Sequence, residues 1–194
     1  RFKLPGVKLD AEHADAVSRG DMDTAQRMVD EAAKAAGYDV EGWHGTRSIS
    51  PITEFRTSRE GKEEAIFFSD SKDEAVQFPY PRGSTSSVRA WLKGNFAEVD
   101  AHGELYEPDV MERWIRDARE AGKDGVHVRN IQNFENGARS DTYAVFKPSQ
   151  IKSADAATYD DNGDLIPLSR RFDDARADIR FKLPGVTLDD DISA

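Results

Sequence analysis

The pattern of apolar and polar positions divides the chain into a helical region followed by a region of short strands. Between Leu9 and Tyr38, apolar residues recur every three to four positions, which predicts two short amphipathic helices. Gly20 and Asp21 separate the two helices, with Asp21 as the N-cap of the second helix and Gly37 at its C-terminal end. The pattern therefore predicts a helical hairpin over residues 10–37.

After Tyr38 the period shortens towards two, which is typical of strands with one buried face. Short helices are expected over residues 71–78, capped by Asp70 or Ser71, and over residues 108–123, with Pro108 at the start. The predicted strands are residues 39–46, 65–70, 86–95, 124–131 and 141–148. This order predicts an α+β fold with a mostly antiparallel or split sheet, because strands and helices do not alternate as in a doubly wound fold.

The two ends of the chain carry the same seven residues, RFKLPGV, at positions 1–7 and 180–186. The Pro-Gly pair in each copy favours a turn, and we interpret the copies as a recurring linker, with a docking strand as the alternative. The stretch before the second copy is acidic and rich in turn residues. We therefore expect four segments: a linker repeat (1–9), the hairpin (10–37), an α+β domain (38–154) and an acidic, poorly ordered tail (155–194).

The composition of the chain disfavours several classes of function. The net charge of −10 disfavours a protein that coats nucleic acid, because phosphates would be repelled by most of the surface. The chain has no cysteine, which removes disulfides, thiol catalysis and cysteine-type zinc sites. No apolar run approaches the roughly 18 residues of a membrane helix and no signal peptide opens the chain, so no membrane association is expected.

The familiar catalytic motifs are also missing from the sequence. There is no HExxH or other metal motif, so no metal is expected, and there is no GxGxxG, GxxxxGK[ST] or GxSxG. Asp and Glu are too numerous for the sequence to select a pair for glycoside chemistry. What remains is the triplet His44-Gly45-Thr46 after a tryptophan, the aromatic pair Phe67-Phe68, and a polar residue that opens the strand DTYAVF.

In this order, the segments GWHGT, AIFFSDSKDEAVQF, GKDGVHVRNI and DTYAVFKPSQIKSA resemble the ADP-ribosyltransferase fold. The resemblance covers residues 38–154. More narrowly, these segments resemble the ADP-ribosyltransferase domain of phage polyvalent and MuF-type proteins. That domain resembles the branch of the fold with a histidine and aromatic residues, which includes diphtheria toxin and poly(ADP-ribose) polymerases. It implies a split antiparallel sheet with flanking helices, and NAD as co-substrate.

The resemblance also assigns roles to individual residues. His44 would bind the adenosine-side ribose, and Gly45, followed by Thr46, would hold the carboxamide through its backbone. Phe67 would stack on nicotinamide at the family's tyrosine position, and Phe78 would form a second aromatic wall. Ala75 falls where polymerases often place a serine.

The family's catalytic glutamate is replaced in this chain. The alignment puts Thr142 at its position, with Asp141 one residue earlier. Because strand side chains alternate between faces, both can enter one cleft only at a β-bulge. Either Asp141 acts through a bulge, or Gln150 or a loop residue such as Glu135 substitutes, or catalysis is weak.

The function implied is mono-ADP-ribosyl transfer from NAD to an unknown acceptor, with a host protein expected and nucleic acid only as an acceptor. The resemblance implies a protein of the phage virion that is delivered into the host cytoplasm. The alternative is a catalytically inactive module of the same fold that serves as a structural or interaction segment of a virion protein.

Overall fold

The computed structural model describes residues 6–48, 50–57, 64–78, 86–134 and 137–180. The helices are α1 (Gly6–Ser18), α2 (Met22–Ala35), α3 (Lys72–Ala75), α4 (Pro108–Glu120) and α5 (Leu168–Arg171), and a 3-10 turn spans Pro148–Gln150. The strands are β1 (Val40–Thr46), β2 (Ile66–Ser69), β3 (Ser86–Leu92), β4 (Phe96–Asp100), β5 (Gly125–Gln132), β6 (Arg139–Val145) and β7 (Ile151–Ser153). The expected α+β class is confirmed.

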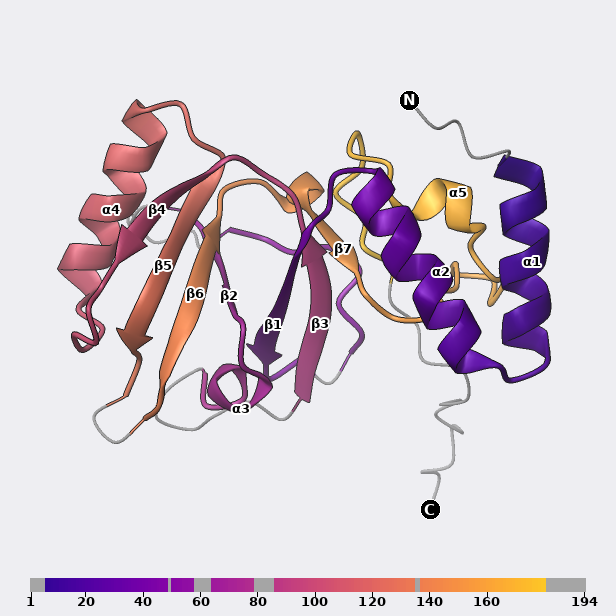
Figure 1. The fold of residues 1–194 in the computed structure, drawn as a ribbon, viewed down its shortest axis with the longest axis horizontal. Coiled ribbons are helices and arrows are strands. Elements are labelled where there is room, and N and C mark those ends of the chain that lie inside the picture. The colour runs from indigo at the N-terminus through magenta and orange to yellow at the C-terminus, as the bar shows by residue number, and fades with distance from the viewer. Residues whose placement is uncertain (1–5, 49, 58–63, 79–85, 135–136, 181–194) are drawn as a thin grey trace, which may run out of the picture.

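The strands form one seven-stranded sheet in the order β4-β5-β6-β2-β1-β3-β7. Every neighbouring pair is antiparallel except β4 and β5, which are parallel. Figure 1 shows α4 at the β4 end of the sheet, the α1–α2 hairpin with α5 at the opposite end, and α3 below β1. The two strands absent from our prediction, β4 and β7, occupy the edges.

The helical hairpin forms as its caps predict. The Asp21 side chain accepts a hydrogen bond from the Thr24 backbone amide at 3.2 Å. Gly37 adopts a φ of +83°, and the amide of Tyr38 reaches the Ala33 carbonyl at 2.9 Å, which is the bonding pattern of a Schellman end. Helix α1 begins at Gly6, inside the first copy of the repeat, so the segment expected as a linker is helical from there on. Residues 1–5 of that copy lie outside the described residues.

Two apolar clusters lie on opposite faces of the sheet. Ala144 belongs to the cluster under α4, which includes Met111 and Ile115 of that helix. Its neighbour in β6, Val145, belongs to the other cluster, with Phe55 and Ile179. Adjacent strand residues point to opposite faces, so α4 covers one face and the segments around Phe55 and Ile179 cover the other.

The segment after Ala154 differs from the expected poorly ordered tail. Between residues 155 and 180 it contributes the short helix α5 and the buried side chains of Thr158, Leu168, Arg171 and Ile179. Helix α5 packs against both helices of the hairpin. The acidic, turn-rich composition does not prevent packing, because the polar groups of this segment bond to one another and to the domain. Residues 181–194, with most of the second repeat, lie outside the described residues.

None of the helices in the described part of the chain has the length and apolar character needed to cross a bilayer.

Candidate functional site

The centre of the sheet contains a weakly paired boundary between β1 and β2. These strands pair at one register position, Trp43 opposite Ser69, whereas β1 pairs with β3 at seven positions. A cavity of about 670 Å³ opens at this boundary, and we call it the seam cavity. Its lining residues are Trp43, His44, Gly45, Thr46, Arg47, Ile52, Glu54, Phe55, Arg56, Ala65, Ile66, Phe67, Phe68, Ser69, Ala75, Phe78, Tyr106, Asn133 and Thr142.

His44 bridges the boundary with its side chain. Its Nδ1 lies 2.8 Å from the Phe67 carbonyl oxygen, and its ring meets the rings of Phe55 and Phe68 at centroid distances of 4.9 and 5.5 Å. Burial lowers the pKa of His44, against the opposing effect of the hydrogen bond to Phe67. A neutral imidazole that donates through Nδ1 has a free lone pair on Nε2. Nε2 can therefore accept a hydrogen bond from a ligand hydroxyl.

Gly45 has a structural reason to be glycine that the sequence did not reveal. A Cβ at this position would lie 1.9 Å from the carbonyl oxygen of Ala75 and 2.9 Å from that of Phe78. The absence of a side chain therefore lets α3 and the turn after it sit directly against β1. Ser71 caps α3 by accepting from the Glu74 amide at 3.3 Å, and Ala75 is buried beneath the contact.

Aromatic side chains form much of the wall. Phe68 is 2% exposed and packs in the core, whereas Phe67 is 38% exposed and is one of the few large apolar residues open to solvent. The two neighbours thus differ in burial as strand alternation requires, with Phe67 as the accessible ring. Phe78 also lines the cavity, and its ring lies 4.9 Å from that of Phe134.

The structure separates the two candidates for the third catalytic group. Thr142 lines the seam cavity, and its hydroxyl accepts a hydrogen bond from Asn133 Nδ2 at 3.3 Å. The carboxylate of Asp141 points to the opposite face, where His127 Nε2 lies 2.8 Å away and the Asn130 amide donates at 3.1 Å. The irregularity in this ladder lies between Val128 and Ile131 of β5. This irregularity sets Arg129 and Asn130 of β5 opposite Asp141, yet Asp141 is not among the residues that line the seam cavity.

The other substitutes proposed for the glutamate do not reach the cavity either. Gln150 is buried and bonds to the backbones of Lys93, Asp124 and Lys147, so its role is structural. Glu135 lies outside the described residues. The one carboxylate among the described lining residues is Glu54, which is exposed and comes from the loop after β1.

Seven of the residues named from the sequence line the seam cavity: His44, Gly45, Thr46, Phe67, Ala75, Phe78 and Thr142. The sequence analysis missed four other lining residues with polar groups: Glu54, Ser69, Tyr106 and Asn133. Ser69 could have been found, because it lies two residues after Phe67 in the predicted strand 65–70 and strand alternation puts both on one face. Glu54 and Tyr106 lie in irregular segments that carry no periodic signal. The described residues hold no group of three or more metal-ligating side chains that could bind a metal ion.

Comparison of the chain with family models, with curated proteins and with solved structures finds no match.

Proposed function

We propose that the seam cavity binds NAD and that the protein transfers ADP-ribose to an acceptor with release of nicotinamide. One observation carries the proposal. Segments far apart in the sequence, at residues 44–46, 67, 75–78 and 142, line a single cavity that combines aromatic rings with a neutral imidazole. Its volume of about 670 Å³ lies within the usual range of small-molecule pockets, about 300–1,000 Å³.

The proposed reaction is a substitution at the ribose carbon that bears nicotinamide. The bond from that carbon to the pyridinium nitrogen breaks, and its electron pair leaves with nicotinamide as a neutral molecule. A nucleophilic atom of the acceptor then bonds to the same carbon and loses its proton to solvent or to a base. The transition state carries positive charge on the ribose, as in glycoside hydrolysis.

The lining residues offer a group for each of these requirements. His44 Nε2 accepts from a ribose hydroxyl, and the exposed ring of Phe67 stacks on the planar nicotinamide. The negative charge of Glu54 is available to the developing positive ribose, in place of the family's glutamate. Thr142 and Asn133 add a polar pair at the position of that glutamate.

The test is incubation of the full chain with NAD labelled in the adenylate part and a bacterial lysate, with nicotinamide release measured in parallel. We expect labelling that Phe67→Ala reduces by about tenfold or more, because an aromatic contact and its buried area contribute over 1 kcal/mol. His44→Ala should abolish transfer. His102→Ala is the control, since this histidine is exposed and is not among the residues that line the cavity. Transfer that survives His44→Ala would reject the site.

A second candidate function rests on Thr142. In the alignment, a hydroxyl that does not ionise takes the place of the family's glutamate, and Glu54, the one carboxylate among the described lining residues, is exposed. Both features favour an NAD-binding module without transferase activity. Binding of NAD in calorimetry without any nicotinamide release would support this alternative. The virion and host locations implied by the resemblance remain predictions of the same proposal.

A further inference from the structure

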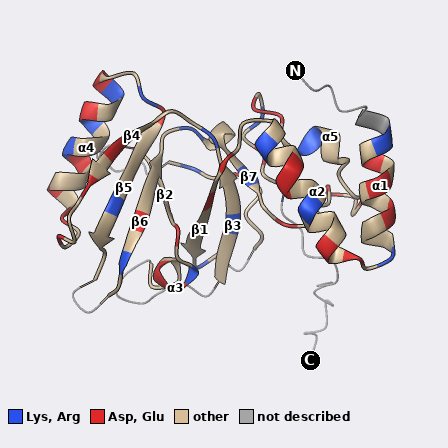
Figure 2. Cartoon of the chain, in the orientation of Figure 1, with Lys and Arg blue, Asp and Glu red and all other residues tan. Residues whose placement is uncertain are grey.

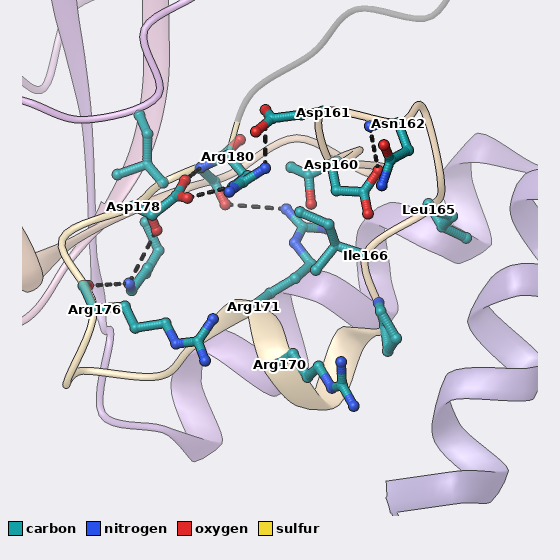
Figure 3. Close-up of a pocket in the computed structure, with 15 residues that line it drawn as sticks. Asp160, Asp161, Asn162, Leu165, Ile166, Arg170, Arg171, Arg176, Asp178 and Arg180 are labelled. Atoms are coloured by element: carbon teal, nitrogen blue, oxygen red, sulfur yellow. Dashed lines mark hydrogen bonds and ion pairs between the residues drawn. The ribbon is translucent and has the colours of Figure 1, made fainter.

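A second cavity, of about 380 Å³, lies beside β7 and α5, and we call it the arginine pocket (Figure 3). Basic side chains outnumber acidic ones in its lining, and Figure 2 shows α5 carrying positive charge. Its lining residues are Lys152, Ser153, Thr158, Asp160, Asp161, Asn162, Leu165, Ile166, Pro167, Arg170, Arg171, Arg176, Asp178, Ile179 and Arg180. Five cations face three carboxylates here, in a chain whose net charge is −10.

The three carboxylates of the pocket are already bonded. Asp160 accepts hydrogen bonds from the amides of Asn162 and Asp164 at 2.9 and 3.0 Å and so closes a turn. The guanidinium of Arg180 lies between the other two, paired with Asp178 and with Asp161 (Figure 3). These acids neutralise Arg180, and Arg176 pairs with Asp173 outside the lining at 3.4 Å, so within the described residues Lys152, Arg170 and Arg171 are the lining cations without an ion pair.

Two of the remaining cations are buried and form no direct ion pair, although carboxylates such as Asp155 and Asp173 act on them from a longer distance. Arg171 is 7% exposed and donates to the carbonyls of Ser153, Asp155 and Ala156 at 3.1, 2.6 and 3.4 Å. Lys152 is 2% exposed and donates to two carbonyls, those of Arg176 and Asp178. Neither forms an ion pair within the described chain. Burial lowers the pKa of both groups, that of Arg171 to about 10. Buried charge is costly unless it is compensated by a counter-charge.

A third observation points to a missing partner. The hydroxyl of Thr158 is buried, with the residue 1% exposed, and no acceptor or donor of the described chain reaches it. Thr158 lines the same pocket. A buried hydroxyl without a partner costs about 1–3 kcal/mol, so its presence in a polar pocket favours a bound group that completes it.

We propose that the arginine pocket binds a small phosphate-bearing anion, of the phosphate monoester or diphosphate class. The three lining cations that form no ion pair within the described residues, Lys152, Arg170 and Arg171, supply the positive charge that a dianionic phosphate group requires. Arg170 and Arg176 are exposed at the mouth and supply the capturing charge, while Lys152, Arg171 and Thr158 form the floor. The volume exceeds that of a single phosphate and leaves room for a small organic body. This site is separate from the seam cavity and does not rest on the NAD proposal.

The experiment titrates the full chain with inorganic phosphate and with glycerol 3-phosphate at constant ionic strength, by calorimetry and by phosphorus NMR. We expect saturable binding that the double variant Arg170→Gln/Arg176→Gln weakens by about tenfold or more, each tenfold being about 1.4 kcal/mol. Both side chains are exposed, so this variant should fold normally. The matched control is Arg113→Gln/Arg116→Gln, which removes the same charge from the exposed side of α4.

Two further variants keep the test decisive. Thr158→Val should weaken phosphate binding without lowering stability in the absence of anion, because valine removes only the unpartnered hydroxyl. His44→Ala should leave phosphate binding unchanged. The proposal is overturned if the wild type shows no saturable binding, if the two double variants bind equally, or if His44→Ala removes the signal.

Discussion

The seam cavity and the arginine pocket are lined by chemically different groups. Strands β1, β2 and β6 with the helix α3 form most of the seam cavity, and its character is set by aromatic rings and close backbone contact. The arginine pocket is formed mainly by the irregular segment 158–180, held together by buried cations on carbonyl oxygens. The bridge of Glu54 with Asp178 and the bond from the Ile179 amide to the Thr53 carbonyl link their walls. This difference predicts that substitutions will destabilise the two regions for different physical reasons.

The largest expected effect tests backbone contact at the seam cavity. Gly45→Ala places a methyl group 1.9 Å from the Ala75 carbonyl oxygen, and backbone on both sides prevents simple relief. We expect the free energy of unfolding to fall by about 3 kcal/mol or more, measured by urea titration. NAD binding should be lost with it.

The control for this variant is Gly137→Ala. The nearest atoms to an added Cβ there are 3.3–3.4 Å away, so a much smaller change of at most about 0.5 kcal/mol is expected. If Gly45→Ala unfolds at the same urea concentration as Gly137→Ala, α3 is not seated directly on β1.

The next effect tests the buried cations. Arg171→Met removes the hydrogen bonds that the guanidinium donates to three backbone carbonyls. Removing a buried charge stabilises the fold, but it offsets only part of the loss of these bonds. We expect a loss of about 2 kcal/mol in the free energy of unfolding. Arg170→Met, on the same short helix but exposed, should change it by less than about 0.5 kcal/mol. Equal effects of the two substitutions would show that the buried charge does not hold the segment.

The smallest expected effect concerns two histidines, one in the seam cavity and one next to Arg171. His44 lies in the seam cavity, and His13 bonds through Nε2 to the carbonyl of Ala156, which Arg171 also contacts. Burial lowers the pKa of both, so below about pH 6.5 the unfolded chain binds protons that the folded chain does not. Each histidine should therefore destabilise the fold as pH falls from 7, by up to about 1.4 kcal/mol per pH unit.

The measurement is the free energy of unfolding between pH 7 and pH 5 for three variants. His13→Gln and His44→Gln should each flatten the decline seen in the wild type. His102→Gln should retain it, because this side chain is 81% exposed. A wild-type slope in either of the first two variants would mean that the histidine concerned takes up its proton as readily in the folded state.

Most of the residues predicted for the seam cavity were implied by the resemblance of short segments to a known family. Strand alternation, a local rule, adds that Phe67 and Phe68 point to opposite faces. The observed register decides between Thr142 and Asp141, which the sequence left open. The edge strand β4 escaped prediction because Glu98 and Asp100 interrupt its apolar pattern. Its pairing with β5 is a property of the assembled sheet.

The arginine pocket was not predictable for a different reason. The partners of Lys152 and Arg171 are backbone carbonyls 15 to 26 positions away. Because every residue has a backbone carbonyl, the sequence does not indicate which of them a side chain will bond. His13 shows the same effect. Helical periodicity assigns it to the polar side of α1, yet the segment around Ala156 covers it completely. The resemblance of short segments thus pointed to residues of the first cavity, whereas the second depends on long-range packing that no segment indicates.

The single pairing position between Trp43 and Ser69 has a mechanical consequence. The ladders on either side of it have seven and four pairing positions. The side chain of His44, which lies 2.8 Å from the Phe67 carbonyl oxygen, is a second polar connection across the same boundary. We therefore expect β1 and β2 to separate more readily than either strand separates from its other neighbour.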